Sequence, residues 1–223
     1  AQRSSILRDL KDFVAIASVS ADPSARPEIQ RAAEWVAAYL RRLGAANVAI
    51  YPTDGSPVVY GEIMEAGPAR PTILIYGHYD VQPAEPLELW HSPAYEATQR
   101  GDNLYGRGVS DMKGQIIIVF KAVEALRQGG PLGVNLKFLI EGEEEIGSPN
   151  LEPFIRAHKD LLSCDFSLNP DSGMLSPELP TVTYGLRGLA YFELRVSGPT
   201  SDLHSGQFGG MIHNQAQAVC ELI

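Results

Sequence analysis

Apolar residues along the chain recur with helical spacing in some stretches and with strand spacing in others. Between Ile6 and Ala17 they return every three or four positions, which predicts a helix with one buried stripe. The same spacing predicts helices over 27–44, 112–128 and 214–223, and Ser148 with Pro149 as the cap and first turn of a helix through Phe154. Short apolar runs bounded by turn residues predict strands over 48–51, 58–63, 72–76, 134–140 and 164–168.

Strands and helices alternate up to about residue 180. Such alternation predicts an α/β fold with a mostly parallel sheet and helices on both faces, and we expect it to occupy residues 1–185. Beyond it, 181–184 and the alternating run 189–196 predict strands, the second half-exposed. A strand and a helix alone make a poor domain, so we expect 186–223 to begin a smaller α+β domain that continues past Ile223.

Composition and charge narrow the classes of function. The chain has 223 residues, 44% of them apolar, and no run long enough to cross a membrane. Its first residues lack the features of a signal peptide, so we expect a cytoplasmic protein. The net charge of −9 disfavours binding to nucleic-acid phosphates. Cys164 and Cys220 have apolar neighbours and are predicted to be reduced, part-buried thiols.

Polar residues of the kinds that bind metals or act in catalysis follow the predicted strands. His78 ends the strand that begins at Thr72, at the sheet edge where α/β proteins bind ligands. Asp80 lies two positions on, so both side chains point to the same side. Asp111 stands in a glycine-rich loop before a predicted helix, where it is either an acidic N-cap or a metal ligand. Further acids at strand ends are Glu144, Glu145 and Asp171.

Each of these acids taken alone is equally well a solvated loop charge or a helix cap. Together, one histidine and several carboxylates on one rim of a sheet indicate a site. Mixed nitrogen and oxygen ligands suit zinc, manganese or cobalt better than calcium. The adjacent carboxylates of Glu144 and Glu145 can divide into a metal ligand and a general base acting on water.

Four motifs carry a resemblance to a known family. They are His78-Tyr79-Asp80-Val81-Gln82-Pro83, Leu104-Tyr105-Gly106-Arg107-Gly108 with Asp111-Met112-Lys113-Gly114, Glu141-Gly142-Glu143-Glu144-Glu145-Ile146-Gly147-Ser148, and Asp202-Leu203-His204-Ser205-Gly206. Their order resembles the dinuclear-zinc metallopeptidases, which include carnosinase, bacterial dipeptidases, glutamate carboxypeptidase, aminoacylase, acetylornithine deacetylase and succinyl-diaminopimelate desuccinylase. The resemblance covers nearly all of this chain and about the first half of a family member.

The resemblance implies a role for each matching residue. It implies two divalent metal ions, most simply zinc, with His78 binding one of them and Asp111 bridging both. Glu145 would then bind one metal and Asp171 the other. Asp80 would orient the imidazole of His78 without binding a metal itself.

The resemblance also implies that Glu144 is the general base. It makes His204 the histidine that, in family dimers, reaches the partner subunit's active site to bind substrate or to polarise the scissile carbonyl. The family's remaining metal ligand is a histidine beyond residue 223. His91, His158 and His213 are predicted to be ordinary surface or capping residues, so none of them fills that place.

The function expected from the resemblance is metal-dependent hydrolysis of the amide bond of dipeptides or small peptides by a homodimer. The stretch from His78 to Pro83, with Leu89 and Trp90, resembles the dipeptidase and carnosinase branch. Two alternatives stay open: deacylation or desuccinylation of N-acyl amino acids, and an inactive fragment that lacks the C-terminal metal ligand.

Overall fold

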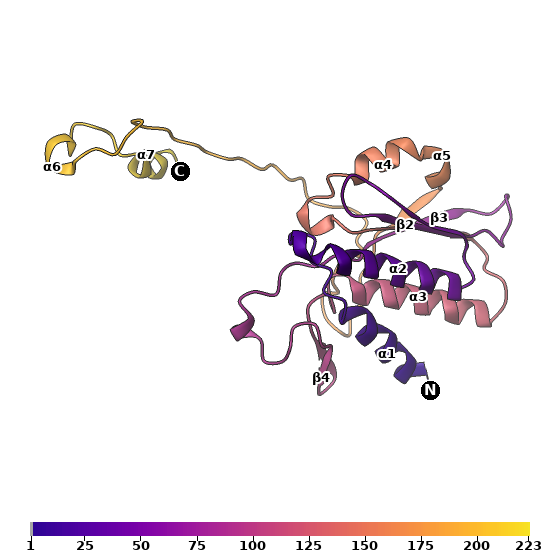
Figure 1. Cartoon of the computed structure of the whole chain (residues 1–223). Helices are drawn as coiled ribbons and strands as arrows, with labels where there is room; N and C mark the ends of the chain where they lie inside the picture. Colours follow the sequence, from indigo (N-terminus) through magenta and orange to yellow (C-terminus); the bar gives the residue numbers. More distant parts are fainter. Residues whose placement is uncertain (1) are drawn as a thin grey trace. The chain divides into compact units, whose positions relative to one another are not determined.

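The computed structural model describes residues 2–223, which divide into two compact units. The first unit extends to Thr181 and the second runs from Val182 to Ile223. The first contains a sheet and the helices that cover it, whereas the second is small and helical (Figure 1). Each unit is described by itself.

A five-stranded sheet forms the centre of the first unit, in the order β1-β2-β6-β3-β7. Its strands are β1 (Ala46–Tyr51), β2 (Val58–Ile63), β3 (Thr72–His78), β6 (Asn135–Glu141) and β7 (Phe166–Leu168). β3 lies between β6 and β7 and is parallel to both, while β2 is antiparallel to β1 and β6. The sheet is therefore mixed. The parallel strand β3 ends at His78, which lies at the edge of the sheet where it was expected.

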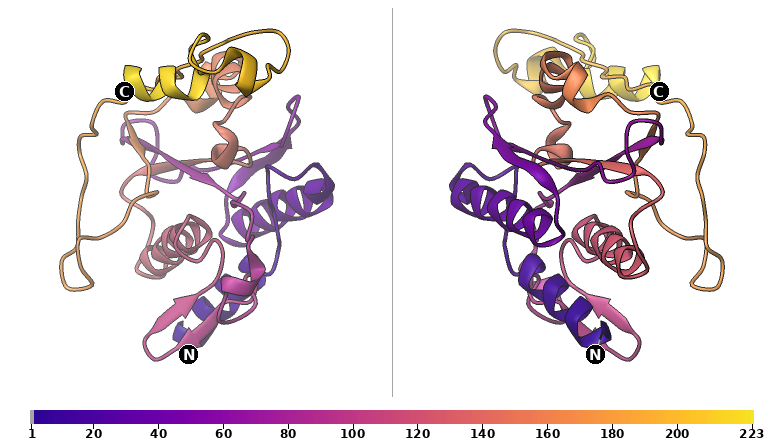
Figure 2. Two further views of the ribbon diagram at one scale, coloured as in Figure 1. Left: turned by 90° about the vertical axis from the view of Figure 1, so that its left-hand side faces the viewer. Right: turned by 90° about the vertical axis from the view of Figure 1, so that its right-hand side faces the viewer.

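Helices cover both faces of this sheet (Figures 1 and 2). On one face lie α1 (Gln2–Val14), α2 (Arg26–Arg42) and α3 (Lys113–Gln128), and on the other lie α4 (Leu151–Ala157) and α5 (Lys159–Leu162). Successive side chains of a strand point to opposite faces, so Phe138 and Ile140 join the apolar cluster of the first face and Leu139 joins that of the second. Covering both faces explains why every residue of β6 is buried.

Short elements connect these parts. The described residues also form the 3₁₀ turns η1 (Pro23–Ala25), η2 (Leu87–Leu89) and η3 (Glu144–Ile146), together with a hairpin of β4 (Thr98–Arg100) and β5 (Asn103–Tyr105). Among residues 2–223, no helix is long and apolar enough to cross a membrane.

The predicted cap at Ser148 is wrong, and of the two alternatives for Asp111 the helix cap is excluded. α4 begins at Leu151 with Asn150 at the N-cap, not with Ser148. Ser148 instead donates a hydrogen bond from Oγ to Glu141, because the buried carboxylate of Glu141 requires donors. Asp111 does not cap α3 either, since Met112 holds the N-cap position.

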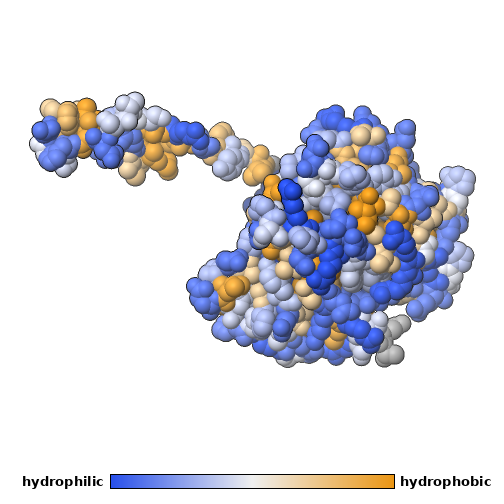
Figure 3. Space-filling view, viewed as in Figure 1, coloured by the Kyte–Doolittle hydropathy of each residue, from blue (hydrophilic) through white to orange (hydrophobic). Residues whose placement is uncertain are grey.

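The second unit contains α6 (Ser205–Phe208) and α7 (Gln215–Leu222), the latter capped by the side chain of Asn214. The strands expected over 181–184 and 189–196 are not formed, which corrects the prediction. A lone strand has no neighbour to pair its backbone groups, so alternation alone does not produce one. Large apolar side chains therefore stay exposed on this unit (Figure 3).

Both cysteines are free thiols, as expected. Cys164 and Cys220 are, however, exposed rather than part-buried. Apolar neighbours in the sequence did not indicate burial, because Cys164 lies just before β7 at the edge of the sheet and Cys220 lies on α7, which has no buried residue.

Candidate metal centre

The fully buried side chain of His78 lies at the centre of the candidate site. Its Nε2 atom is 3.1 Å from Oδ1 of Asp111 and 3.5 Å from Oδ2 of Asp171. Potential ligand atoms of these three residues all lie within 4.8 Å of one another. The structure thus brings together one nitrogen and two carboxylate ligands from positions far apart in the sequence.

The topology of the sheet explains this convergence. β3 and β7 are parallel neighbours, so the loops that follow them leave from the same edge. His78 is the last residue of β3, and Asp171 follows the end of β7. Asp111 comes from a third direction, immediately before the N-cap of α3, and the Asp111–Met112 peptide bond is cis.

The donor set fits a divalent metal such as zinc, which binds imidazole nitrogen and carboxylate oxygen. A metal-binding histidine ordinarily hydrogen-bonds a carboxylate or carbonyl through its other ring nitrogen. Nδ1 of His78 does so here, lying 3.2 Å from Oδ1 of Asp80 and 3.1 Å from its backbone oxygen. Nε2 is thereby left to face Asp111 and Asp171.

Asp80 makes further contacts that the sequence did not indicate. Its Oδ1 accepts a hydrogen bond from the backbone nitrogen of Glu144 at 3.2 Å, and its Oδ2 accepts one from that of Glu145 at 3.1 Å. One buried carboxylate therefore fixes both the imidazole of His78 and the start of η3.

The ionisable groups of the site influence one another. Burial by itself lowers the pKa of His78, but the hydrogen bond and charge of Asp80, with the charges of Asp171 and Glu144, raise it to about 9. Burial raises the pKa of Glu144, although the charge of His78 opposes this in part. Burial likewise raises the pKa of Asp171 against the opposing effect of His78. Such mutual dependence is typical of functional sites.

The three consecutive glutamates have three different environments. Glu143 is buried and accepts hydrogen bonds from the backbone of Ser56 and the side chain of Asn150, so it holds a loop in place. The carboxylate of Glu144 is 39% exposed and lies 3.9 Å from Nε2 of His78. Glu144 therefore presents a partly exposed carboxylate close to the candidate ligands.

Glu145 lies beside these residues, although it is outside the group formed by His78, Asp111 and Asp171 among residues 2–223. Its Oε2 accepts a hydrogen bond of 3.0 Å from the side chain of Gln82, which also donates to the backbone oxygen of Glu145. Sequence reasoning gave Gln82 no role. The sequence did offer one indication, because Gln82 lies four residues after His78 in the loop that follows the end of β3.

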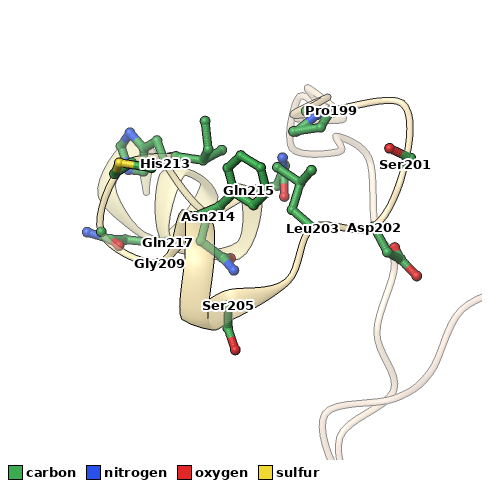
Figure 4. A pocket seen from close by; sticks show the side chains of 15 residues that line it. Pro199, Ser201, Asp202, Leu203, Ser205, Gly209, His213, Asn214, Gln215 and Gln217 are labelled. Atoms are coloured by element: carbon green, nitrogen blue, oxygen red, sulfur yellow. The ribbon is translucent and has the colours of Figure 1, made fainter.

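His204 belongs to the second unit. It is exposed and caps α6, where its Nδ1 accepts a hydrogen bond from the backbone nitrogen of Gly206. The same unit has a hollow of about 910 Å³, lined by residues from Gly198 to Gln217 but not by His204 (Figure 4).

The other three histidines have ordinary surroundings. His91 is exposed, and His158 ends α4, where its ring stacks on Phe154. His213 is exposed, and its Nε2 is 3.1 Å from a carboxylate oxygen of Glu221. These placements are those of surface and capping residues.

Comparisons with known proteins agree with the family resemblance. The model of peptidase family M20/M25/M40 matches residues 74–214, which is more than half of the chain. Cys-Gly metallodipeptidase dug1 of Schizosaccharomyces pombe is 38% identical over 92% of this chain and 45% of its own length. Human Beta-Ala-His dipeptidase is 39% identical over 93% of this chain and 44% of its own length.

Solved structures show the same likeness. Human carnosine dipeptidase 1 aligns with a TM-score of 0.77 at 32% identity, over 98% of this chain and 49% of that one. The dipeptidase Dug1p of Saccharomyces cerevisiae aligns with a TM-score of 0.77 at 27% identity, over 99% of this chain and 49% of that one. This chain spans about half the length of the curated relatives it matches.

Proposed function

This chain belongs to peptidase family M20/M25/M40, and from that premise we propose that the whole protein hydrolyses the amide bond of dipeptides or other small peptides. The observation that carries the proposal is the meeting of His78, Asp111 and Asp171 beside the carboxylate of Glu144. The dipeptidase names of the relatives support a dipeptide over an N-acylated amino acid as substrate.

The proposed centre would take two divalent metal ions, most simply zinc. His78 and Asp171 would hold one of them, Glu145 would hold the other, and Asp111 would serve both. The short distances among His78, Asp111 and Asp171 support the first set of ligands. For Glu145, the support is its position at the start of η3, fixed by the bonds from Gln82 and to Asp80.

Bound metal supplies the positive charge that polarises the scissile carbonyl and lowers the pKa of the attacking water. The oxygen of that water attacks the carbonyl carbon, and Glu144 takes a proton from the water at the same time. The same carboxyl group then gives the proton to the leaving nitrogen as the carbon–nitrogen bond breaks. The raised pKa of Glu144 suits this exchange, since a general base works best when its pKa approaches the operating pH.

We assign the catalytic, metal-binding role to residues 1–185 and a dimerisation and lid role to a domain that begins at 186. Exposed apolar side chains on the second unit support an association surface in the whole protein. In the resulting homodimer His204 serves the partner's active site. Two free cysteines are compatible with the reducing cytoplasm, where we place the protein.

A substrate panel with defined metals tests the proposed function. The whole protein, stripped of metal and reloaded with zinc, manganese or cobalt, is assayed against dipeptides and against N-acetyl and N-succinyl amino acids. We expect hydrolysis of dipeptides at a kcat/KM at least tenfold above that of the acylated compounds, and none without metal. Preferred cleavage of the acylated compounds would assign the protein to the deacylases, and full turnover without metal would refute the mechanism.

A further inference from the structure

The segment from Phe13 to Val19, called here the brace, contacts the stretches of backbone beside two candidate ligands, His78 and Asp111. Oγ of Ser18 donates a hydrogen bond of 2.6 Å to the backbone oxygen of Tyr79, next to His78. The backbone oxygen of Ser18 accepts one of 2.9 Å from the nitrogen of Val81. The brace lies outside the stretch that the family model matches, which begins at residue 74.

Lys113 ties the second stretch to the same brace. Its Nζ donates hydrogen bonds to the backbone oxygens of Ile16 at 2.6 Å and Phe13 at 3.2 Å. Both Lys113 and Ser18 are fully buried. A buried ammonium group without partners is costly, and the carboxyl end of a helix such as α1 favours a cation, so these bonds fix the position of Lys113.

Fixing Lys113 also fixes Asp111. Lys113 is the first residue of α3, two positions after Asp111. The backbone on either side of these residues is closely packed, because a Cβ atom on Gly114 would lie 2.0 Å from the backbone oxygen of Val109. The side chain of Asp111 is 62% exposed, so its surroundings restrain it little and the backbone decides where its carboxylate lies.

We propose that Lys113 and Ser18 are positioning residues for the metal centre. By holding residues 78–81 and 111–113 on one common segment, they keep His78 and Asp111 at the 3.1 Å separation that suits shared binding of a cation. This inference rests on the proposed metal-dependent function. It assigns the N-terminal region a part in metal binding although that region supplies no ligand.

The chain offers a matched control in a second buried lysine. Nζ of Lys137 donates to the backbone oxygens of Leu161 and Ser163, both at 2.7 Å, at the end of α5. Its contacts therefore resemble those of Lys113, which also bonds two carbonyls at the end of a helix. Lys137 lies four residues before the end of β6, roughly 13 Å along the strand from the edge that carries the site.

The test compares zinc and cobalt affinities of the full chain carrying Lys113→Met, Lys137→Met or Ser18→Ala, by competition with a chromophoric chelator. Affinities are measured below the unfolding midpoint of each variant, determined by circular dichroism. We expect both lysine variants to unfold more easily. Only Lys113→Met should weaken metal binding, by about 10–100-fold as for other groups that orient ligands, with a smaller loss for Ser18→Ala.

A folded Lys113→Met chain with unchanged affinity, or an equal loss in Lys137→Met, would overturn the positioning role and leave the proposed function intact. Should Lys113→Met fail to fold, unchanged affinity in Ser18→Ala overturns it instead. Absence of metal binding by the unaltered chain would refute the proposed metal centre itself, and the inference with it.

Discussion

The buried carboxylate of Asp80 links His78 to the start of η3 at Glu144, which lies 64 residues after Asp80. It lies against Nδ1 of His78 and accepts hydrogen bonds from two consecutive backbone amides. Hydrogen bonds to an ionised acceptor are stronger than neutral ones, and burial strengthens them further. One side chain therefore sets both the ring orientation of a candidate ligand and the position of Glu144 and Glu145.

Replacing Asp80 with alanine should lower metal affinity by about 10–100-fold, because His78 loses its orienting partner. Competitive metal titration of folded protein measures this. A suitable control is Asp165→Ala, since Asp165 also accepts a backbone hydrogen bond, from Thr72, but at the opposite end of β3. If Asp80→Ala binds metal as tightly as this control, Asp80 does not orient His78.

Glu144 lies close to the candidate ligands without belonging to their group. In the whole protein, Glu144→Gln should leave metal content near normal but lower kcat by about 10²–10⁴-fold, because it removes proton transfer and keeps the shape of the side chain. Steady-state kinetics and elemental analysis report the two quantities separately. The matched variant Glu145→Gln should instead lose metal. Retained turnover in Glu144→Gln would place the base elsewhere.

At the scale of elements, the loop after β6 depends on close packing at Gly142. A Cβ atom there would lie 2.4 Å from ring atoms of Tyr79, which is fully buried and donates a hydrogen bond to the backbone oxygen of Pro57. Burial and this hydrogen bond hold the ring in place. The glycine thus lets the loop that carries Glu144 approach the strand end that carries His78.

Gly142→Ala should accordingly destabilise the first unit by about 1–3 kcal/mol, the usual cost of overpacking. Urea unfolding followed by tryptophan fluorescence measures the change in the free energy of unfolding. Gly133→Ala is the control, because a Cβ atom at Gly133 has no neighbour within 4 Å, and it should stay within about 0.5 kcal/mol of the unaltered protein. Equal effects at both positions would contradict the packing argument.

Charged groups also join the three helices on one face of the sheet. Oδ2 of Asp9 on α1 lies 2.6 Å from Nζ of Lys121 on α3 and 3.2 Å from the guanidinium of Arg42 at the end of α2. Burial alone raises the pKa of Asp9, but the hydrogen bond from Lys121 and the charges of Arg42 and Lys121 outweigh it, so its pKa is lowered.

A carboxylate whose pKa is lower in the folded state stabilises the fold above its unfolded pKa, about 3.9. That stabilisation is lost as the pH falls through the lower folded value. Asp9→Asn should therefore reduce the free energy of unfolding at neutral pH and steadily less below about pH 4. Urea titrations at several pH values test this, with the exposed Asp12→Asn as control. If Asp9→Asn reduced the free energy of unfolding by the same amount at every pH, ionisation of Asp9 would be excluded as the source of this stabilisation.

At the scale of the whole molecule, the second unit has no buried core of its own. None of its helical residues is buried, and side chains such as Tyr184, Leu189 and Phe192 are almost fully exposed. Exposed apolar surface of this kind is typical of an interface. It supports the proposal that this region associates with further structure and with a second copy in the whole protein.

Subunit complementation tests the proposed role of His204 in the whole protein. Glu144→Gln and His204→Ala should each be nearly inactive as homodimers. After subunit exchange, one of the two composite sites in the heterodimer has both groups intact, so about half of the heterodimer's sites should turn over. Mass spectrometry verifies the exchange. Heterodimers that remain inactive would contradict the shared site and leave His204 as a helix cap.

The sequence by itself determined most of the helices and strands of the first unit and the residues proposed to carry its chemistry. Apolar spacing is a local property, so it located α1, α2, α3 and the five strands of the sheet to within a few residues. The motifs also located His78 and Asp111, and the strand pattern placed Asp171 after β7, at the edge of the sheet where β3 ends. The family resemblance followed from those same residues, and the comparisons confirm it.

Only the tertiary structure decided how neighbouring residues divide their roles. The turn η3 directs Glu143 to buried hydrogen bonds and Glu144 towards His78, and no spacing rule distinguishes two adjacent glutamates. The contact of Lys113 with the brace joins positions 97 residues apart. The strands predicted over 181–184 and 189–196 did not form for the same reason: pairing depends on distant partners, which a local pattern does not specify.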